Sequence, residues 1–139
     1  MGCKINGYCS DMTRTIFVGG ITKEQQQIYD LVLSNQQKAL NEIYDGANIK
    51  TIVKSVESEF RLNNQTLIHS LGHGVGLDIH EAPVVSLKND SILKENMVIT
   101  DEPGIYIPGN FGIRIEDTVL VTKKGAIALT ESSKECIIL

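Results

Sequence analysis

The sequence has no tryptophan, only four tyrosines and three phenylalanines, three prolines and three cysteines among 139 residues. Cys3, Cys9 and Cys136 are scattered, odd in number and without CxxC spacing, which argues against a disulfide framework and against a zinc site built of thiolates. No apolar run is long enough to span a bilayer, no signal peptide opens the chain, and no basic run accompanies the net charge of −4. We therefore expect one cytoplasmic domain that binds neither membrane nor nucleic acid.

Two helices are predicted from periodic apolar residues. Thr22 is a natural N-cap with Gln25 as its capping-box partner, and apolar residues at helical spacing continue up to Gly46. A second amphipathic helix begins near Asn48 and ends at residues 63–64. The two stripes predict core-facing surfaces made of Ile28, Leu31, Val32, Ala39, Ile43, Ile49, Ile52, Val53, Val56 and Phe60.

Strands are predicted on both sides of the helices. Asn6-Gly7 is typical of a two-residue turn and predicts a β-hairpin over residues 3–18, whose second strand runs from Tyr8 to Phe17. Residue alternation places Asp11 and Thr13 on one face of that strand. Further strands are predicted over 82–85, 97–102, 105–107, 112–122, 126–130 and 137–139, with a loop over 86–96.

All three histidines lie between positions 69 and 80, and glycines at 72, 74 and 76 flank His73. Glycine has no Cβ, so the backbone there can bend tightly and let other groups approach closely. An imidazole in such a segment is well placed to bind a metal or a substrate. The alternative interpretation is a glycine-rich turn with incidental histidines.

Three carboxylates on predicted strands, those of Asp11, Glu102 and Glu116, join His73 as candidate ligands. A single carboxylate on a strand usually faces solvent. Several buried carboxylates, in contrast, repel one another unless a cation compensates them. Oxygen-rich ligation with one imidazole suits Mn, Co, Fe or Zn, and two such metals close together would polarise one shared water.

Four segments, in this order and with compatible gaps, resemble the pita-bread metallopeptidases, the family of methionine aminopeptidase, aminopeptidase P and prolidase. They are residues 7–15, 69–81, 101–106 and 112–117. The string Ser-Asp-Met-Thr-Arg-Thr at 10–15, and His69 four residues before His73, resemble the Xaa-Pro dipeptidase and Xaa-Pro aminopeptidase branch. The resemblance implies an α+β pita-bread fold, incomplete in this chain, in which a curved, mostly antiparallel sheet carries two long helices on one face.

The same resemblance implies a ligand set. Asp11 and Glu116 would bridge two divalent metals, and His73 and Glu102 would complete one of the two sites. Manganese is the expected metal, with cobalt, zinc or iron as alternatives. Glu102 would also be the general base toward the bridging water.

The resemblance further implies that His80 contacts the substrate carbonyl and the developing oxyanion, and that His69 lines the pocket near the substrate. Arg114 shares the predicted face of Glu116 and is expected to pair with a ligand carboxylate. Structural roles are expected for Tyr8, Asp101 and Asp117.

One family ligand has no counterpart. The first metal-binding Asp of the family lies eleven residues before the bridging Asp, which corresponds to the position before Met1. We therefore expect residues 1–139 to be the C-terminal portion of a catalytic domain, without its N-terminal half and recognition domain. Such a chain should hold one metal or none and be impaired or inactive. The sheet edge exposed in this way predicts self-association, as a homodimer.

The expected function is a metal-dependent proline peptidase that hydrolyses the bond before proline in an Xaa-Pro peptide or dipeptide by means of a metal-activated water. A dedicated pocket is expected because proline lacks an amide N–H and is conformationally restricted. One alternative is a non-catalytic, peptidase-like module that binds peptides. Another is a sister enzyme such as methionine aminopeptidase or creatinase, which the Thr-Arg-Thr string at 13–15 disfavours.

Overall fold

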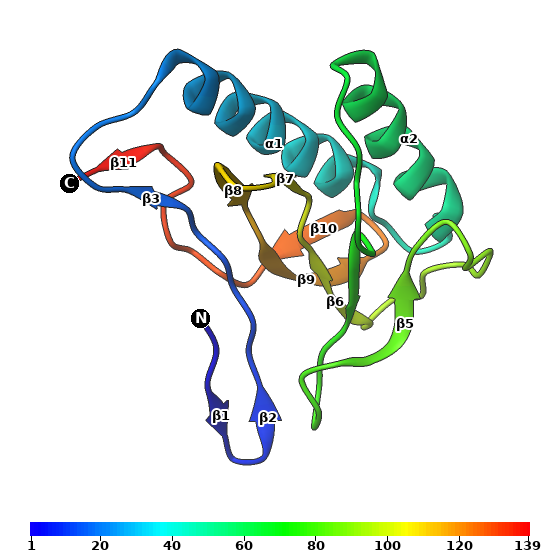
Figure 1. Ribbon diagram of the computed structural model, residues 1–139. Coiled ribbons are helices and arrows are strands. Elements are labelled where there is room, and N and C mark those ends of the chain that lie inside the picture. The colour runs from blue at the N-terminus through cyan, green and yellow to red at the C-terminus, as the bar shows by residue number, and fades with distance from the viewer.

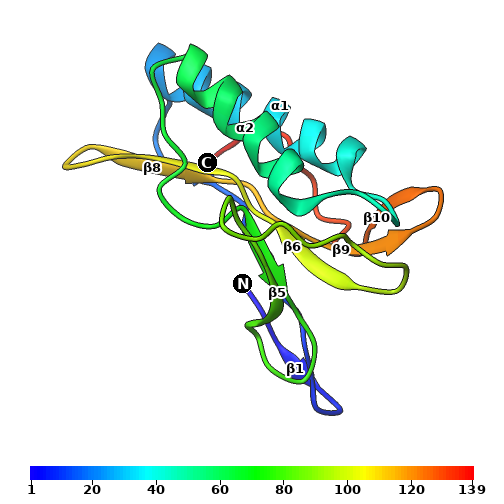
Figure 2. The same ribbon diagram turned by 90° about the vertical axis from the view of Figure 1, so that its right-hand side faces the viewer.

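In the computed structural model, which describes residues 1–139, two helices lie side by side on one face of a twisted antiparallel sheet (Figures 1 and 2). The sheet has five strands in the order β10-β9-β6-β4-β5. Their bounds are β4 Gly72–Gly74, β5 Glu81–Val85, β6 Val98–Asp101, β9 Asp117–Thr122 and β10 Gly125–Ala128. The opposite face of this sheet is the one that carries the candidate site.

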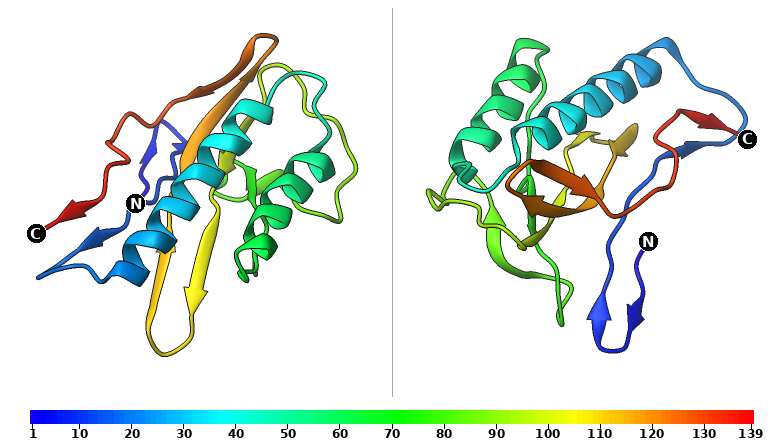
Figure 3. Two further views of the ribbon diagram at one scale, coloured as in Figure 1. Left: turned by 90° about the horizontal axis from the view of Figure 1, so that it is seen from above. Right: turned by 180° about the vertical axis from the view of Figure 1, so that it is seen from behind.

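Three short two-stranded ladders surround this sheet. They are the hairpin β1 (Lys4–Ile5) with β2 (Tyr8–Cys9), the hairpin β7 (Gly104–Ile107) with β8 (Phe111–Arg114), and the parallel pair β3 (Ile16–Phe17) with β11 (Ile137–Ile138). The parallel pair brings residues near the two ends of the chain side by side, as the view from behind shows (Figure 3).

Both helices begin where the sequence predicts. Helix α1 (Lys23–Glu42) starts after Thr22, whose side chain accepts from the Gln25 amide in a complete capping box, and α2 (Ile49–Leu62) starts after the N-cap Asn48. Helix α1 ends at Glu42 and not at the predicted Gly46. The next backbone donors explain this, because Asp45 N–H donates to the Thr122 carbonyl and Gly46 N–H to the Leu93 carbonyl, so tertiary bonds replace helical ones.

The core lies between the helices and the sheet. All of the predicted stripe residues except Leu31 are buried, and Leu31 packs partly buried against the same cluster. The sheet contributes the buried apolar side chains of Val85, Ile99, Val119 and Val121, and β8 and the residue after its end contribute Ile113 and Ile115. Burial of this surface is the main force that fixes the sheet against the helices.

Two predictions of local structure are wrong, and one alternative interpretation is excluded. The expected strand 8–17 is interrupted, since only β2, β3 and a single bridge at Thr13 have strand pairing. The expected strand 112–122 is divided into β8 and β9, with Ile115 and Glu116 between them. The glycine-flanked His73 lies on β4, in the interior of the sheet, which excludes the alternative interpretation of a turn. The missing Cβ atoms of the glycines let neighbouring strands approach closely, as expected.

Candidate metal centre

His73 is held by its neighbours on both sides of β4. A Cβ built at Gly72 would lie 2.0 Å from the Thr100 carbonyl oxygen, and one at Gly74 would lie 2.2 Å from the Ala82 carbonyl oxygen. Glycine is therefore required at both positions for the strands to pack at this distance. The backbone N–H of His73 donates to Thr100 Oγ1 at 3.0 Å, and the residue is buried with 8% of its surface exposed.

The hydrogen bond of the His73 ring defines which nitrogen faces the site. Nδ1 lies 3.0 Å from the Gly74 carbonyl oxygen. Because a carbonyl only accepts, Nδ1 carries a proton, and Nε2 is the ring nitrogen that faces the site and can offer a lone pair to a metal. Nε2 lies 3.2 Å from Glu102 Oε1 and 3.7 Å from Asp11 Oδ2.

Two overlapping groups of potential ligands surround this nitrogen. Atoms of His73, Glu102 and Glu116 all lie within 4.8 Å of one another, and so do atoms of Asp11, His73 and His80. The four side chains expected as ligands thus come together at one place. His73 lies on β4, Glu102 directly follows β6, Glu116 directly precedes β9, and Asp11 lies in the segment after β2. These elements are far apart in the sequence.

Of the four side chains, only that of Glu116 has a buried polar atom without a hydrogen-bond partner. Its Oε2 accepts from Thr13 Oγ1 at 2.5 Å, whereas its Oε1 is buried without a hydrogen-bond partner. Burial raises the pKa of Glu116, and the nearby charges of Glu102 and Asp11 raise it further, against the opposing effect of the Thr13 hydrogen bond. Among the lysine and arginine side chains, only Arg114 lies within 4.0 Å of a carboxylate oxygen of these residues, with its Nε 3.9 Å from Glu102 Oε2.

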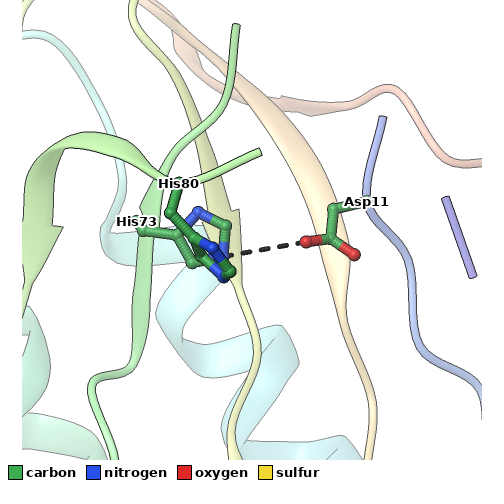
Figure 4. Close-up of side chains that lie close together, drawn as sticks. All are labelled: Asp11, His73 and His80. Carbon is green, nitrogen blue, oxygen red and sulfur yellow. Dashed lines mark ion pairs between the residues drawn. The ribbon is translucent and has the colours of Figure 1, made fainter. Parts of the chain in front are cut away.

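His80 lies at the exposed side of the centre. Its ring centroid is 4.3 Å from that of His73 and the two rings meet at 63°. Figure 4 shows both rings on one side of the gap and the carboxylate of Asp11 pointing toward them from the other. This position leaves His80 free to contact a group that enters from solvent.

His69 belongs to a chain of hydrogen bonds in the wall of the pocket. Its Nδ1 lies 2.7 Å from the Ser70 carbonyl oxygen, so Nδ1 donates and Nε2 accepts from the Tyr106 hydroxyl at 3.0 Å. Tyr106 in turn accepts from Arg114 Nη1 at 3.0 Å. The pocket has a volume of about 550 Å³ and is lined by all three histidines together with Ser70, Glu81, Ala82, Val84, Glu102 and Arg114.

Behind the centre, on the helix side of the sheet, Asp117 forms a buried ion cluster. Its Oδ1 accepts from Arg14 and Thr130 at 2.7 Å each, and its Oδ2 accepts from Lys134 at 2.6 Å and from Gln36 at 2.9 Å. Burial alone would raise the pKa of Asp117, but the hydrogen bonds from Lys134, Thr130 and Arg14 hold it below its usual range. This environment agrees with the structural role expected for Asp117.

The neighbouring Asp101 has no such partners. Both of its carboxylate oxygens are buried without a hydrogen bond, and it pairs across the strands with Asp117. Burial, and next the charge of Asp117, raise the pKa of Asp101 well above its usual value. Tyr8, the third residue expected to be structural, is largely exposed on the β1–β2 hairpin.

Several residues that support the site were not assigned a role from the sequence. Thr13 binds Glu116, Thr100 Oγ1 donates to Glu102 Oε1 at 3.0 Å, and Tyr106 links His69 to Arg114. Residue alternation placed Thr13 on the face of Asp11, and the same alternation along residues 100–102 puts Thr100 on the face of Glu102. For Tyr106 no local signal exists, since its partners lie far from it in the sequence.

The donor set fits a divalent cation. An imidazole lone pair and the oxygens of three carboxylates point at one another, and one buried carboxylate oxygen has no partner at all. Acceptors facing acceptors in a partly buried place repel one another unless a cation lies between them. One nitrogen and several oxygens are ligands suited to Mn, Fe, Co or Zn.

Comparison with known proteins agrees with this chemistry. Residues 1–123 match the sequence profile of metallopeptidase family M24. An Xaa-Pro dipeptidase from Pyrococcus furiosus is 46% identical over 140 residues, which cover 99% of this chain and 40% of that protein. A putative dipeptidase from Bacillus subtilis is 43% identical and is covered over 39% of its length. The chain therefore spans about 40% of the length of these relatives.

Solved structures give the same result for the fold. An X-Pro aminopeptidase from Thermotoga maritima superposes with a TM-score of 0.95 at 37% identity, over 99% of this chain and 40% of that one. A prolidase from Thermococcus sibiricus superposes with a TM-score of 0.96 at 40% identity, over 99% and 38% of the two chains. The α+β pita-bread fold expected from the sequence is confirmed for the part of it that the chain covers. By the match over most of its length, this chain is a member of metallopeptidase family M24.

Proposed function

We propose that residues 1–139 form the C-terminal portion of the catalytic domain of a metal-dependent Xaa-Pro peptidase, which hydrolyses the bond before proline. The names of the similar proteins, Xaa-Pro dipeptidase, X-Pro aminopeptidase and prolidase, support this substrate class. An Xaa-Pro peptide or dipeptide is the proposed substrate. The match to a metallopeptidase family over residues 1–123 supports the reaction type.

The metal ligands are proposed to be Asp11, His73, Glu102 and Glu116. The observation that carries this assignment is the convergence of side chains on His73 Nε2, which lies 3.2 Å from Glu102 Oε1 and 3.7 Å from Asp11 Oδ2. The unpartnered Oε1 of Glu116 supports it independently. A divalent cation bound among these groups supplies Lewis-acid polarisation of a carbonyl and lowers the pKa of a coordinated water.

The protein's own residues supply the remaining chemistry. Glu102 is the proposed general base, because its carboxylate lies at the border between the ligand group and the open pocket. His80 is exposed on the same side and is proposed to contact the substrate carbonyl and the oxyanion that develops from it. His69 is proposed to line the substrate pocket, with its ring fixed by Ser70 and Tyr106.

Three further properties are proposed for the protein. Manganese is the proposed metal, because oxygen-rich ligands prefer hard cations. A cytoplasmic location is proposed from the three cysteines, which are all unpaired. No helix of the structure combines the length and the apolar character that crossing a bilayer requires. A homodimer is proposed because the β3–β11 pair leaves Ile16, Val18, Ile138 and Leu139 largely exposed at an edge.

Titration of the chain with Mn²⁺ tests the site, because the four proposed ligands are all present in it. We expect saturable binding, and at a free Mn²⁺ concentration of about 100 times Kd the chain should gain about 2.7 kcal/mol in free energy of unfolding. Replacing Glu116 with Gln should abolish most of this gain. A matched control is Glu95→Gln, since Glu95 is an exposed acid paired only with Lys123 at 3.2 Å. Equal Mn²⁺ affinity in both variants and the parent chain would contradict the ligand assignment.

Peptide hydrolysis separates an enzyme from a non-catalytic module that only binds peptides. Ala-Pro, with Ala-Ala for comparison, is incubated with the chain in the presence and absence of Mn²⁺, and released alanine is measured. Metal-dependent release from Ala-Pro alone would support the proposed enzyme. Binding of Ala-Pro, measured by calorimetry, without release of alanine would support the binding module only for a chain that is loaded with Mn²⁺, since a chain without bound metal is expected to be inactive.

A further inference from the structure

Glu116 lies just outside the hydrogen-bonded ladder of the main sheet. The pairing of β6 with β9 ends at Asp101 and Asp117, and β8 has already ended at Arg114. The sheet alone therefore does not fix the position of Glu116. A side chain that binds a metal has to be held within about 0.5 Å of its productive position, so some other contact must do this.

The segment Asp11–Thr15 supplies the missing contact, although it has little strand pairing of its own. Only Thr13 forms a bridge, in which the N–H of Glu116 donates to the Thr13 carbonyl at 3.0 Å. Elsewhere threonine hydroxyls replace the backbone bonds of a ladder. Three such bonds follow one antiparallel register. Thr118 Oγ1 donates to the Asp11 carbonyl at 2.6 Å, Thr13 Oγ1 donates to Glu116 Oε2 at 2.5 Å, and Thr15 Oγ1 donates to the Arg114 carbonyl at 2.9 Å.

Arg14 points to the other side of this segment and ties it to its surroundings. Its side chain is only 9% exposed. Nη1 donates to the carbonyl oxygens of Thr13 at 2.9 Å and of Glu116 at 2.5 Å. The other donors reach Asp117 Oδ1 at 2.7 Å and the carbonyl oxygens of Ser132 and Ser133 at 2.9 and 3.0 Å. One guanidinium thus joins the segment that carries Asp11, the backbone of Glu116 and the C-terminal part of the chain.

The planar guanidinium is essential to this arrangement. An ammonium group is a compact charge on a flexible stem, so a lysine at position 14 could still pair with Asp117 but could not hold the Thr13 and Glu116 carbonyls in a fixed fork. Lys134 offers a natural comparison. It binds the same carboxylate at 2.6 Å, and its other hydrogen bond goes to Gln36 at 3.1 Å, so that it makes none to the segment or to Glu116.

From these contacts we infer that Arg14 is a positioning residue for the metal centre: it holds the segment Asp11–Thr15 against residues 114–118 and thereby fixes the carboxylates of Asp11 and Glu116 relative to each other. The inference rests on the proposed function. It also gives a physical role to the Arg of the Thr-Arg-Thr string, which contacts neither His73 nor the pocket.

Titration of the chain with Co²⁺ alone tests this inference, with the cobalt absorption spectrum and the thermal midpoint of the metal-free chain as readouts. The variants are Arg14→Lys, Lys134→Met as the matched control, and Glu116→Gln as the reference for the site. We expect Arg14→Lys to weaken Co²⁺ binding by about tenfold or more and to change the cobalt spectrum. Lys134→Met should lower the thermal midpoint but leave Co²⁺ affinity within about twofold of the parent chain, because it leaves the bonds of Arg14 to the backbone in place.

The outcomes separate this inference from the proposed function. Parent-like Co²⁺ affinity in Arg14→Lys, together with lost affinity in Glu116→Gln, overturns the inference alone. Equal loss of affinity in Arg14→Lys and Lys134→Met also overturns it, since general destabilisation would then explain both. No Co²⁺ binding by the parent chain, or undiminished binding by Glu116→Gln, contradicts the proposed site itself. If Arg14→Lys does not fold, Arg14→Gln serves as the second variant, and unchanged affinity in it overturns the inference equally.

Discussion

Replacing Gly72 with Ala should destabilise the fold and displace His73, because the new methyl group has no room. The Cβ would meet the Thr100 carbonyl oxygen at 2.0 Å and its carbonyl carbon at 2.7 Å, whereas ordinary contacts begin at 3.4 Å. The two nearest atoms belong to the backbone of β6, and only the third, Thr100 Oγ1 at 2.9 Å, belongs to a side chain. Relief of the clash therefore requires β4 and β6 to move apart by more than an ångström.

The size of the effect follows from the bonds that join these strands. Separation would weaken the bond from His73 N–H to Thr100 Oγ1, at 3.0 Å, and the bond from Glu102 N–H to the Leu71 carbonyl, at 2.8 Å. Each such bond contributes about 1 kcal/mol, and overpacking a tight interior costs about 1–3 kcal/mol. We therefore expect a loss of about 3 kcal/mol in the free energy of unfolding, or roughly 10 °C in the thermal midpoint.

Gly76→Ala provides the matched control in the same segment. Its new Cβ would approach only the carboxylate of Glu81, at 2.6 to 2.9 Å, and that flexible group can rotate away. Calorimetry of the metal-free chain should show a large shift for Gly72→Ala and a small one for Gly76→Ala, and Mn²⁺ binding should weaken only in the former. Equal thermal midpoints for the parent chain and Gly72→Ala would refute the close approach of the two strands.

The remaining predictions concern buried charge and association. Asp101→Asn should stabilise the chain at neutral pH by roughly 1–3 kcal/mol, since it removes a buried carboxyl that lacks partners. Because the pKa of Asp101 is raised in the fold, the protonated carboxyl is compatible with folding, and stability is lost as pH rises and the group ionises. The gain of Asp101→Asn in free energy of unfolding, measured with urea, should therefore disappear at acid pH. A lower unfolding midpoint at pH 7 would argue against this. The pKa of Asp117 is lowered instead, so its contribution is present above about pH 3.9 and is lost as pH falls through the folded value. The free energy of unfolding should accordingly fall more steeply with decreasing pH in the parent chain than in Asp117→Asn. Identical pH dependence in the two proteins would contradict the ion cluster. Sedimentation velocity across a wide range of concentration should detect a homodimer, which a compact monomer at the highest concentration would exclude.

Local sequence patterns predicted those parts of the fold that local chemistry controls. Both helix N-caps and the hairpin turn need only contacts between residues a few positions apart. The turn at Asn6 and Gly7 has the positive φ angles of 51° and 87° that this residue pair adopts readily. The apolar stripes of the helices likewise predicted their buried faces, because helical geometry relates residues three and four positions apart.

Breaks in strands could not be predicted in this way. The run from Gly112 to Thr122 has continuous alternation, yet pairing stops at Ile115 and Glu116 because β8 pairs with β7 whereas β9 pairs with β6 and β10. The glycines beside His73 indicated either a tight bend or a close approach of other groups, and the structure uses them for the close approach of strands. Which of these two uses applies depends on neighbours such as Thr100, which alternation along a single segment cannot identify.

By itself, the sequence determined which groups are available for chemistry, namely four candidate ligands, one of them His73, and two further histidines in motifs of a metallopeptidase family. Only the tertiary structure decided how these groups are held. Thr13 and Glu116 are separated by 103 positions, and Arg14 and Lys134 meet at Asp117 from opposite ends of the chain. Contacts of this kind form when apolar burial brings the helices and strands together, so they depend on the whole fold and leave no regular spacing along the chain.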